Sequence, residues 1–283
     1  MEIKSLEHTG QRSIFQAFAR AFKDYEIQLD YGQFQAMMQR RGFDPALSFA
    51  AFDGDEMASF TLNGIGQFNG LYTAYDTGTG TREEYRGKSL AASIFEQSIP
   101  YLKAAGIEQY LLEVLQHNTK AVSLYKRLGF ETVREFNYFM QAKSEIAIVE
   151  PNSDFHIKKT EIDDIGLVSA FWDFHPSWQN SLDSIKRSVN CFTCLGAFCD
   201  STIVGYGIFE PATGDITQLA VDKTHRRKGV ATALLNKIMT MTTSDKLKVV
   251  NTDISCKAMT DFLKSKNINV SGTQFEMIRD FRH

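Results

Sequence analysis

The chain has 283 residues, of which 43% are hydrophobic and 23% charged, and its formal net charge at pH 7 is −3. This balance is typical of a globular protein and gives no global basic field, so we expect neither nucleic acid nor a membrane as a partner. The length suits two domains that each bury a core. Because the chain has no long apolar run and no signal-peptide pattern, we expect a cytoplasmic protein.

The N-terminal quarter predicts a strand, two helices and a hairpin. Residues 2–6 suit a strand, Gln11–Phe22 repeats apolar residues at helical spacing, and Tyr31–Arg41 suits a second helix. The runs Leu47–Phe52 and Met57–Leu62, joined by a turn containing Asp-Gly, predict a β-hairpin.

The stretch from Leu71 to Phe130 contains a basic turn between a strand and a helix. Unpaired N–H groups and the helix dipole make such a turn favourable for an anion. Gly87 permits backbone conformations that a side chain resists, while Arg86 and Lys88 add positive charge. The turn therefore predicts a diphosphate site.

The same order of elements recurs after a linker that contains residues 150–153. We expect helices over Ile162–Phe174 and Leu182–Val189, and a hairpin from Cys194 to Phe209. The repeat predicts an α/β protein of two tandem domains, 1–143 and 154–283, each a mostly antiparallel mixed sheet flanked by helices.

Both halves resemble the core of GNAT-superfamily N-acetyltransferases, whose Arg/Gln-x-x-Gly-x-Gly/Ala loop holds the diphosphate of acetyl-CoA. The first loop is Arg86, Gly87, Lys88, Ser89, Leu90 and Ala91, and the second is Arg226, Arg227, Lys228, Gly229, Val230 and Ala231. Leu219, Ala220 and Val221, in the strand before the second loop, are also typical of the family. Ser89 replaces a family glycine, and because a serine in the first helical turn is sterically acceptable, we expect weaker rather than abolished binding.

The resemblance implies acetyl-CoA as co-substrate, no metal, and direct attack of an amine on the thioester. The family's asparagine and tyrosine correspond to Asn118 and Tyr125, whereas the second half has Ser255 and Phe262 at the same offset. A phenol is protonated at neutral pH, so Tyr125 is the predicted acid for the leaving thiolate, and Asn118 is predicted to contact CoA or the backbone.

The general base stays open among Glu113, Asp76 and His117, each of which also suits a structural or solvated role. The acceptor, a small-molecule or peptide amine, is expected to bind near residues 22–26 or near the aromatic segment 171–180. A helix end packing aromatic side chains explains the second segment equally well.

Two functions remain open. The leading one is an acetyl-CoA-dependent N-acetyltransferase with an active N-terminal half, and a second active site that protonates the thiolate through water stays open. In the alternative, one half is a degenerate acyl-CoA-binding, substrate-binding or structural module. The four cysteines, Cys191, Cys194, Cys199 and Cys256, all lie in the second half and are interpreted as small hydrophobic residues without a metal.

Overall fold

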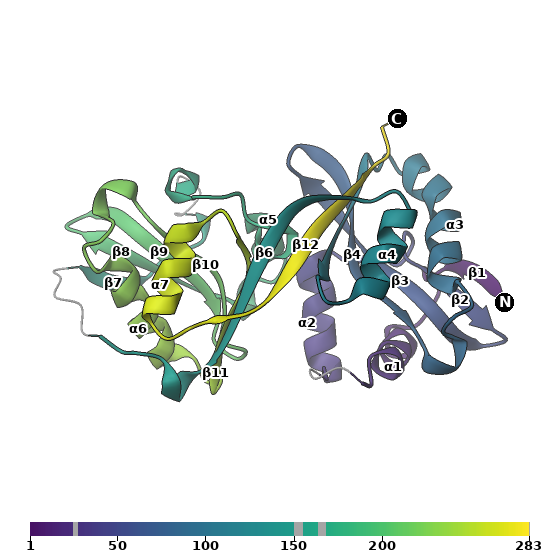
Figure 1. Cartoon of the computed structure of the whole chain (residues 1–283), viewed down its shortest axis with the longest axis horizontal. Coiled ribbons are helices and arrows are strands. Elements are labelled where there is room, and N and C mark those ends of the chain that lie inside the picture. Colours follow the sequence, from purple (N-terminus) through teal and green to yellow (C-terminus); the bar gives the residue numbers. More distant parts are fainter. Residues whose placement is uncertain (25–27, 150–154, 164–167, 283) are drawn as a thin grey trace. The chain divides into compact units, whose positions relative to one another are not determined.

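The computed structural model describes residues 1–24, 28–149, 155–163 and 168–282 (Figure 1). Contacts divide the chain into unit 1, Met1–Arg134 with Phe275–His283, and unit 2, Glu135–Gln274. This division differs from the predicted ranges 1–143 and 154–283, because most of the final strand of each predicted half belongs to the other unit. The predicted linker residues 150–153 and residues 25–26 lie outside the described residues.

Unit 1 is built on a sheet with the order β1-β2-β3-β4-β5-β12. Neighbours from β1 to β4 are antiparallel, whereas β4 and β5 are parallel. The strands are β1 (Glu2–Ser5), β2 (Phe49–Asp53), β3 (Glu56–Phe68), β4 (Leu71–Thr81), β5 (Gln109–Leu115) and β12 (Val270–Asp280), and the helices are α1 (Gln11–Ala21), α2 (Tyr31–Arg41), α3 (Leu90–Ala104) and α4 (Thr119–Arg127).

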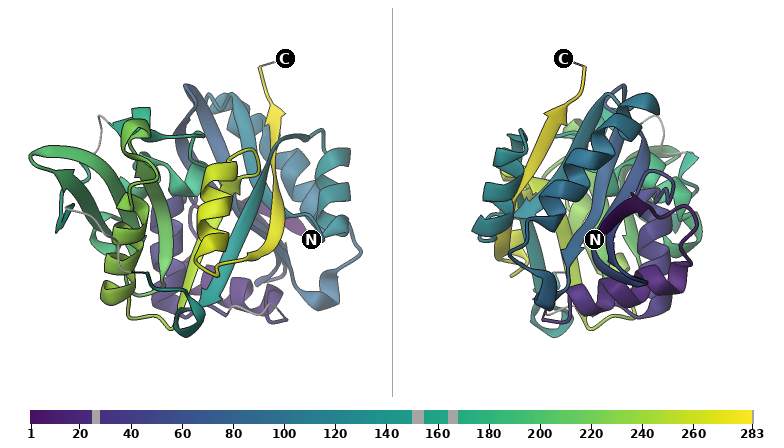
Figure 2. Two further views of the ribbon diagram at one scale, coloured as in Figure 1. Left: turned by 60° about the vertical axis from the view of Figure 1, so that its left-hand side comes forward. Right: turned by 90° about the vertical axis from the view of Figure 1, so that its right-hand side faces the viewer.

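Unit 2 repeats this layout with the order β12-β6-β11-β10-β9-β8-β7. The chain passes from unit 2 to unit 1 within β12, the yellow arrow in Figures 1 and 2. The strands are β6 (Glu131–Ala142), β7 (His156–Lys159), β8 (Thr193–Cys199), β9 (Thr202–Glu210), β10 (Asp215–Val221) and β11 (Lys246–Asp253), and the helices are α5 (Leu182–Arg187), α6 (Val230–Met241) and α7 (Lys257–Ser265).

Strand β2 is buried on both faces, and its alternating side chains enter different cores. Ala50 and Phe52 pack in the cluster that contains residues of α1 and α2, whereas Phe49 and Ala51 pack with Ile94 of α3. The period of two along a strand explains this division. The sheet of unit 1 is therefore covered by helices on both faces.

Helix α2 begins and ends where its sequence predicts. The Asp30 side chain accepts from the N–H of Gln33, and the Gln33 side chain accepts from the N–H of Asp30, which completes a capping box. Gly42 ends the helix in the left-handed region with φ 77°.

The predicted helix over Ile162–Phe174 is wrong in its described part. The structure has a short 3-10 helix at Val168–Phe171, followed by irregular backbone; residues 164–167 lie outside the described residues. Pro176 disfavours helical backbone at His175, and Trp172 is tied to β9 by a 2.5 Å hydrogen bond from Nε1 to the Tyr206 hydroxyl. Tertiary contacts therefore replace helical structure here.

Candidate functional site

The two basic loops share one backbone conformation. The second and fourth loop residues are left-handed in both, with φ 79° at Gly87 and 57° at Ser89, and φ 62° at Arg227 and 91° at Gly229. Helices α3 and α6 begin directly after the fourth residue. Alternating left-handed residues before a helix turn successive N–H groups toward one concavity, which is how backbone nests hold anions.

Ser89 lies in a different place from the one predicted. It is the residue just before α3 rather than a member of its first turn, and its side chain makes no capping hydrogen bond. A left-handed serine is strained, unlike a helical one. The difference between the two loops is therefore a backbone cost as well as an added side chain.

The first arginine of each loop is bound to protein groups rather than held free for a ligand. Arg86 donates to the carbonyl oxygens of Thr81 at 3.3 Å and Ala21 at 3.2 Å. Arg226 donates to those of Val221 at 3.2 Å and Phe171 at 3.1 Å. Each arginine thus connects its own loop to the end of the preceding strand. It also connects the loop to the end of an earlier helix, α1 at Ala21 in unit 1 and the 3-10 helix at Phe171 in unit 2.

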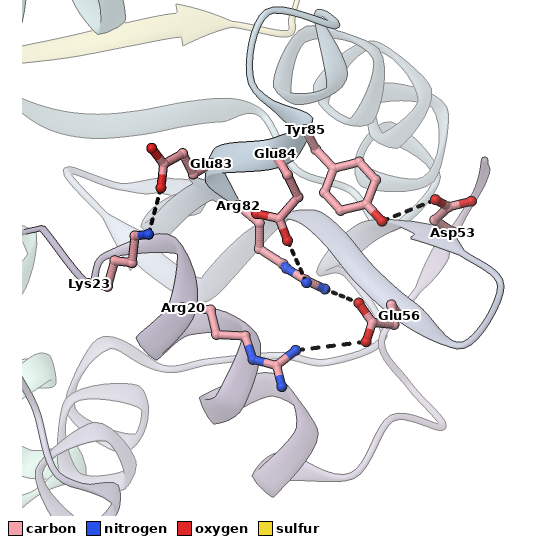
Figure 3. Close-up of polar contacts among 8 residues, drawn as sticks. All are labelled: Arg20, Lys23, Asp53, Glu56, Arg82, Glu83, Glu84 and Tyr85. Atoms are coloured by element: carbon pink, nitrogen blue, oxygen red, sulfur yellow. Dashed lines mark hydrogen bonds and ion pairs between the residues drawn. The ribbon is translucent and has the colours of Figure 1, made fainter.

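Lys88, Arg227 and Lys228 are exposed and supply the remaining loop charge. Before the first loop, Arg82 binds Glu56, and also Glu84 at 2.5 Å, while Lys23 pairs with Glu83 at 2.5 Å (Figure 3). Tyr85 in the same cluster donates to Asp53 at 3.0 Å. At the positions of Glu83 and Glu84 the second loop has Lys223 and Thr224, so it lacks these two negative charges directly before the loop.

Each loop is preceded by a bulged strand that separates from its parallel neighbour. The bulge lies between Asp76 and Gly78 in β4 and between Ile216 and Gln218 in β10, at the same distance before Arg86 and Arg226. Strand β4 pairs with β5 only as far as Tyr75 and Leu111, and β10 pairs with β11 at Asp215 and Lys248. A bulge re-aims side chains, and parting strands leave room for a ligand between them.

In unit 1 the bulge brings Asp76 to Tyr125. The Tyr125 hydroxyl donates to Asp76 Oδ2 at 2.9 Å, and Thr79 donates to the same oxygen at 2.8 Å. Burial raises the pKa of Asp76, and these two hydrogen bonds oppose the rise. Oδ1 of Asp76 is buried and accepts no hydrogen bond from the described part of the chain. The site thus holds a buried carboxyl group in direct contact with a phenol.

The other predicted polar residues of unit 1 have structural contacts. Asn118 is the residue before α4, and its side chain accepts from the N–H of Ala121 at 3.2 Å, so it contacts the backbone. Glu113 accepts from the Tyr75 hydroxyl at 2.6 Å, and His117 is exposed. Of the three candidate bases, Asp76 is the one that the structure places against Tyr125.

Unit 2 contains a cavity of about 510 Å³ along β10, the second loop, β11 and α7. Its lining includes all the predicted residues of that half except Lys228. At the positions of Asp76, Asn118 and Tyr125 this half has Ile216, Ser255 and Phe262, which contain no acid or base. The cavity has the size of a small-molecule site, 300–1,000 Å³.

The two loops and the cavity bear on the predicted co-substrate, acetyl-CoA. Both loops form an N–H concavity that fits a diphosphate, and in unit 2 the cavity continues from the loop between the parting strands, as an extended pantetheine arm requires. The residues present therefore fit a CoA thioester.

The sequence pattern described as "Acetyltransferase (GNAT) family" matches residues 12–130 and again 160–255. The chain belongs to the GNAT family. Over 91 residues it is 29% identical to the uncharacterized N-acetyltransferase YobR of Bacillus subtilis, covering 32% of this chain and 35% of that protein. Over 111 residues it is 28% identical to N-alpha-acetyltransferase 30 of Schizosaccharomyces pombe, covering 38% of this chain and 74% of that protein.

Solved structures share the tandem GNAT fold over the whole chain. A tandem GNAT protein from the clavulanic acid biosynthesis pathway superposes with a TM-score of 0.73 at 10% identity, covering 99% of this chain and 98% of that one. A GCN5-related N-acetyltransferase from Sphaerobacter thermophilus gives 0.72 at 14% identity, covering 100% and 96%. The predicted duplication and fold class are therefore confirmed.

The cysteines of this GNAT protein are free thiols, with Cys194 and Cys256 buried. Within the described ranges, no group of three or more His, Cys, Asp and Glu side chains is arranged to hold a metal ion. None of the helices described is long and apolar enough to cross a membrane.

Sequence reasoning missed three features of the site. These are the pairing of Asp76 with Tyr125, the internal role of Arg86 and Arg226, and the cavity in the half that lacks the acid. The Gly- and Thr-rich sequence of β4 is a signal for a bulge in this strand. It does not indicate the contact of Asp76 with Tyr125, because the two residues lie far apart in the chain.

Proposed function

We propose that this GNAT protein transfers an acetyl group from acetyl-CoA to a primary amine of a small molecule or peptide, and that the chemistry takes place in unit 1. The observation that supports it is the 2.9 Å hydrogen bond from Tyr125 to Asp76 beside the β4 bulge. A buried carboxyl group with a raised pKa and a phenol in contact with it are the acid–base pair that this reaction needs.

The pair accounts for both proton transfers. The amine nitrogen attacks the thioester carbon and loses its proton to Asp76 Oδ1, the oxygen without a protein partner. As the carbon–sulfur bond breaks, Tyr125 donates its proton to the sulfur. Asp76 then gives up the proton that it accepted and the Tyr125 phenolate takes up one proton, which restores both groups. Overall, one proton moves from nitrogen to sulfur.

A single active half is favoured over two. Ile216 and Phe262 replace Asp76 and Tyr125 in unit 2, so the second half has no equivalent route for either proton. The proposed cytoplasmic location rests on the sequence alone.

The test is amine-dependent release of free CoA thiol, with diamines, free amino acids and short peptides as acceptors and mass spectrometry of the product. The proposal predicts release with at least one amine class and a product carrying one added acetyl group. Lys88→Glu reverses a charge at the first loop and is expected to raise the KM for acetyl-CoA about tenfold, which is ~1.4 kcal/mol. Lys228→Glu makes the matched change at the second loop.

Thiol release that does not depend on any amine contradicts the proposed reaction. A larger rise in KM with Lys228→Glu than with Lys88→Glu contradicts the assignment of the chemistry to unit 1.

A further inference from the structure

The cavity of unit 2 is lined by the second loop and by the aromatic side chains Phe171, Trp172 and Phe174, which form its aromatic end. Trp172 is joined through the Tyr206 hydroxyl to Gln218, which directly follows the bulge of β10. In a CoA thioester the pantetheine arm separates the acyl group from the diphosphate. An acyl group that extends from the second loop to the bulge would therefore meet this aromatic surface.

Polar side chains at this end are bonded to one another and to the backbone. Trp172 Nε1 donates to the Tyr206 hydroxyl at 2.5 Å, and that hydroxyl donates to Gln218 Oε1 at 2.8 Å. Gln218 Nε2 donates to the Asn180 carbonyl at 2.6 Å, and the Asn180 side chain donates to the Val250 carbonyl at 2.9 Å. The chain of hydrogen bonds runs from the aromatic segment across β9 and β10 to β11.

A group that is already paired offers little to a polar ligand, because binding it would only exchange one hydrogen bond for another. Asp173 is likewise engaged, with Oδ1 accepting from Arg226 at 2.9 Å. What remains for a ligand at this end is aromatic and aliphatic surface. The contrast with unit 1 is direct, since Asp76 Oδ1 there has no partner among the described residues.

We propose that the cavity of unit 2 binds an acyl-CoA with an apolar acyl chain of several carbons and does not transfer it. The inference rests on the proposed function only in taking CoA as the group on the loop. Ile216 and Phe262 line the cavity where unit 1 has Asp76 and Tyr125, so the bound thioester meets no acid or base from those positions. Unit 2 is then a binding site for a longer acyl-CoA, in a chain whose other unit uses acetyl-CoA.

Isothermal titration of the full chain with acetyl-, butanoyl-, hexanoyl- and octanoyl-CoA, without any amine, tests this directly. One site is expected to bind about three- to fourfold more tightly for each added methylene, until the chain outgrows the cavity. Lys228→Glu is expected to weaken this site about tenfold, whereas Lys88→Glu leaves its dependence on chain length intact.

Equal affinity for acetyl- and octanoyl-CoA would overturn the proposal, as would loss of the chain-length dependence in Lys88→Glu rather than Lys228→Glu. Phe174→Asn gives a second test that does not disturb the core, because Phe174 is half-buried and lines the aromatic end. It is expected to weaken octanoyl-CoA about tenfold while changing acetyl-CoA less than twofold. Equal weakening of both ligands contradicts the placement of the chain.

Failure of this inference is distinguishable from failure of the proposed function. The titrations contain no acceptor, so a chain-length-dependent site can be present in a protein that acetylates no amine. Conversely, amine acetylation with no such site supports the proposed function and removes the inference.

Discussion

Ser89 and Gly229 occupy the same place in two loops, immediately before α3 and α6, and both are left-handed, with φ 57° and 91°. The loops therefore share their backbone although they place glycine differently, at the second position in one and the fourth in the other. The left-handed residues turn the N–H groups inward, so the conformation rather than the glycine pattern is what the two loops have in common.

Gly229→Ala is expected to lower the free energy of unfolding by about 1–2 kcal/mol, because a φ of 91° is unfavourable for a residue with a Cβ. Ser89→Ala is the matched control. Serine already has a Cβ and its side chain makes no capping hydrogen bond here, so Ser89→Ala is expected to change the free energy of unfolding by less than about 0.5 kcal/mol. Urea denaturation of both variants measures the difference, and equal losses would contradict the assigned backbone.

Asp76→Asn is expected to stabilise the protein near neutral pH. The raised pKa of Asp76 means that its contribution to stability is fully present below its ordinary pKa of 3.8 and is lost as the pH rises through the folded-state value. Asparagine does not ionise, so the stability of the variant does not fall in this way as the pH rises. The difference in melting temperature between variant and wild type should therefore grow with rising pH from 3.8 and then level off; a difference independent of pH would contradict the burial of the charge.

The acid limb of the pH–rate profile should follow the same group. If Asp76 accepts the amine proton, kcat/KM falls as the pH decreases through the pKa of Asp76. Because that pKa is raised, the fall should occur at a higher pH than an ordinary aspartate would give. Asp76→Asn is expected to lose about 10²- to 10⁴-fold in rate together with this limb. Retention of the limb in the variant would assign it to another residue.

Arg134 and Glu276 form a two-point ion pair in unit 1, with Nε–Oε2 at 2.6 Å and Nη2–Oε1 at 2.7 Å. The Glu276 side chain is only 2% exposed, so Arg134→Met leaves a buried charge without its partner and is expected to cost about 3–5 kcal/mol. Adding Glu276→Met removes that charge and should recover most of the loss. Thermal unfolding of both variants tests this, and a double variant no more stable than the single one would show that the charge is not the cause.

Much of this fold was readable in the sequence because its signals are local. The α2 capping box, the hairpins and the strand-loop-helix units follow from neighbouring residues, and both loops were located correctly. The two family matches confirm the repeat.

What the sequence did not show depends on partners far along the chain. Residues 275–283 join unit 1 through packing of Met277 and Phe281 with its core, which no local pattern indicates. Asp76, at a bulge of β4, meets Tyr125, which lies 49 residues further along the chain. The aromatic segment near Trp172 is not an α-helix, since contacts with Tyr206 outweigh a weak helical pattern.

The most direct test of the central claim is the steady-state rate of amine acetylation by Tyr125→Phe, with Tyr101→Phe as the matched control. Tyr101 lies on α3 in the same unit and is 61% exposed, so its hydroxyl has no part in the site. The account predicts that Tyr125→Phe lowers kcat about 10²- to 10⁴-fold with little change in acetyl-CoA binding, while the control retains wild-type turnover. Wild-type turnover in Tyr125→Phe across the pH range would show that neither the Tyr125 hydroxyl nor its hydrogen bond to Asp76 takes part in the reaction.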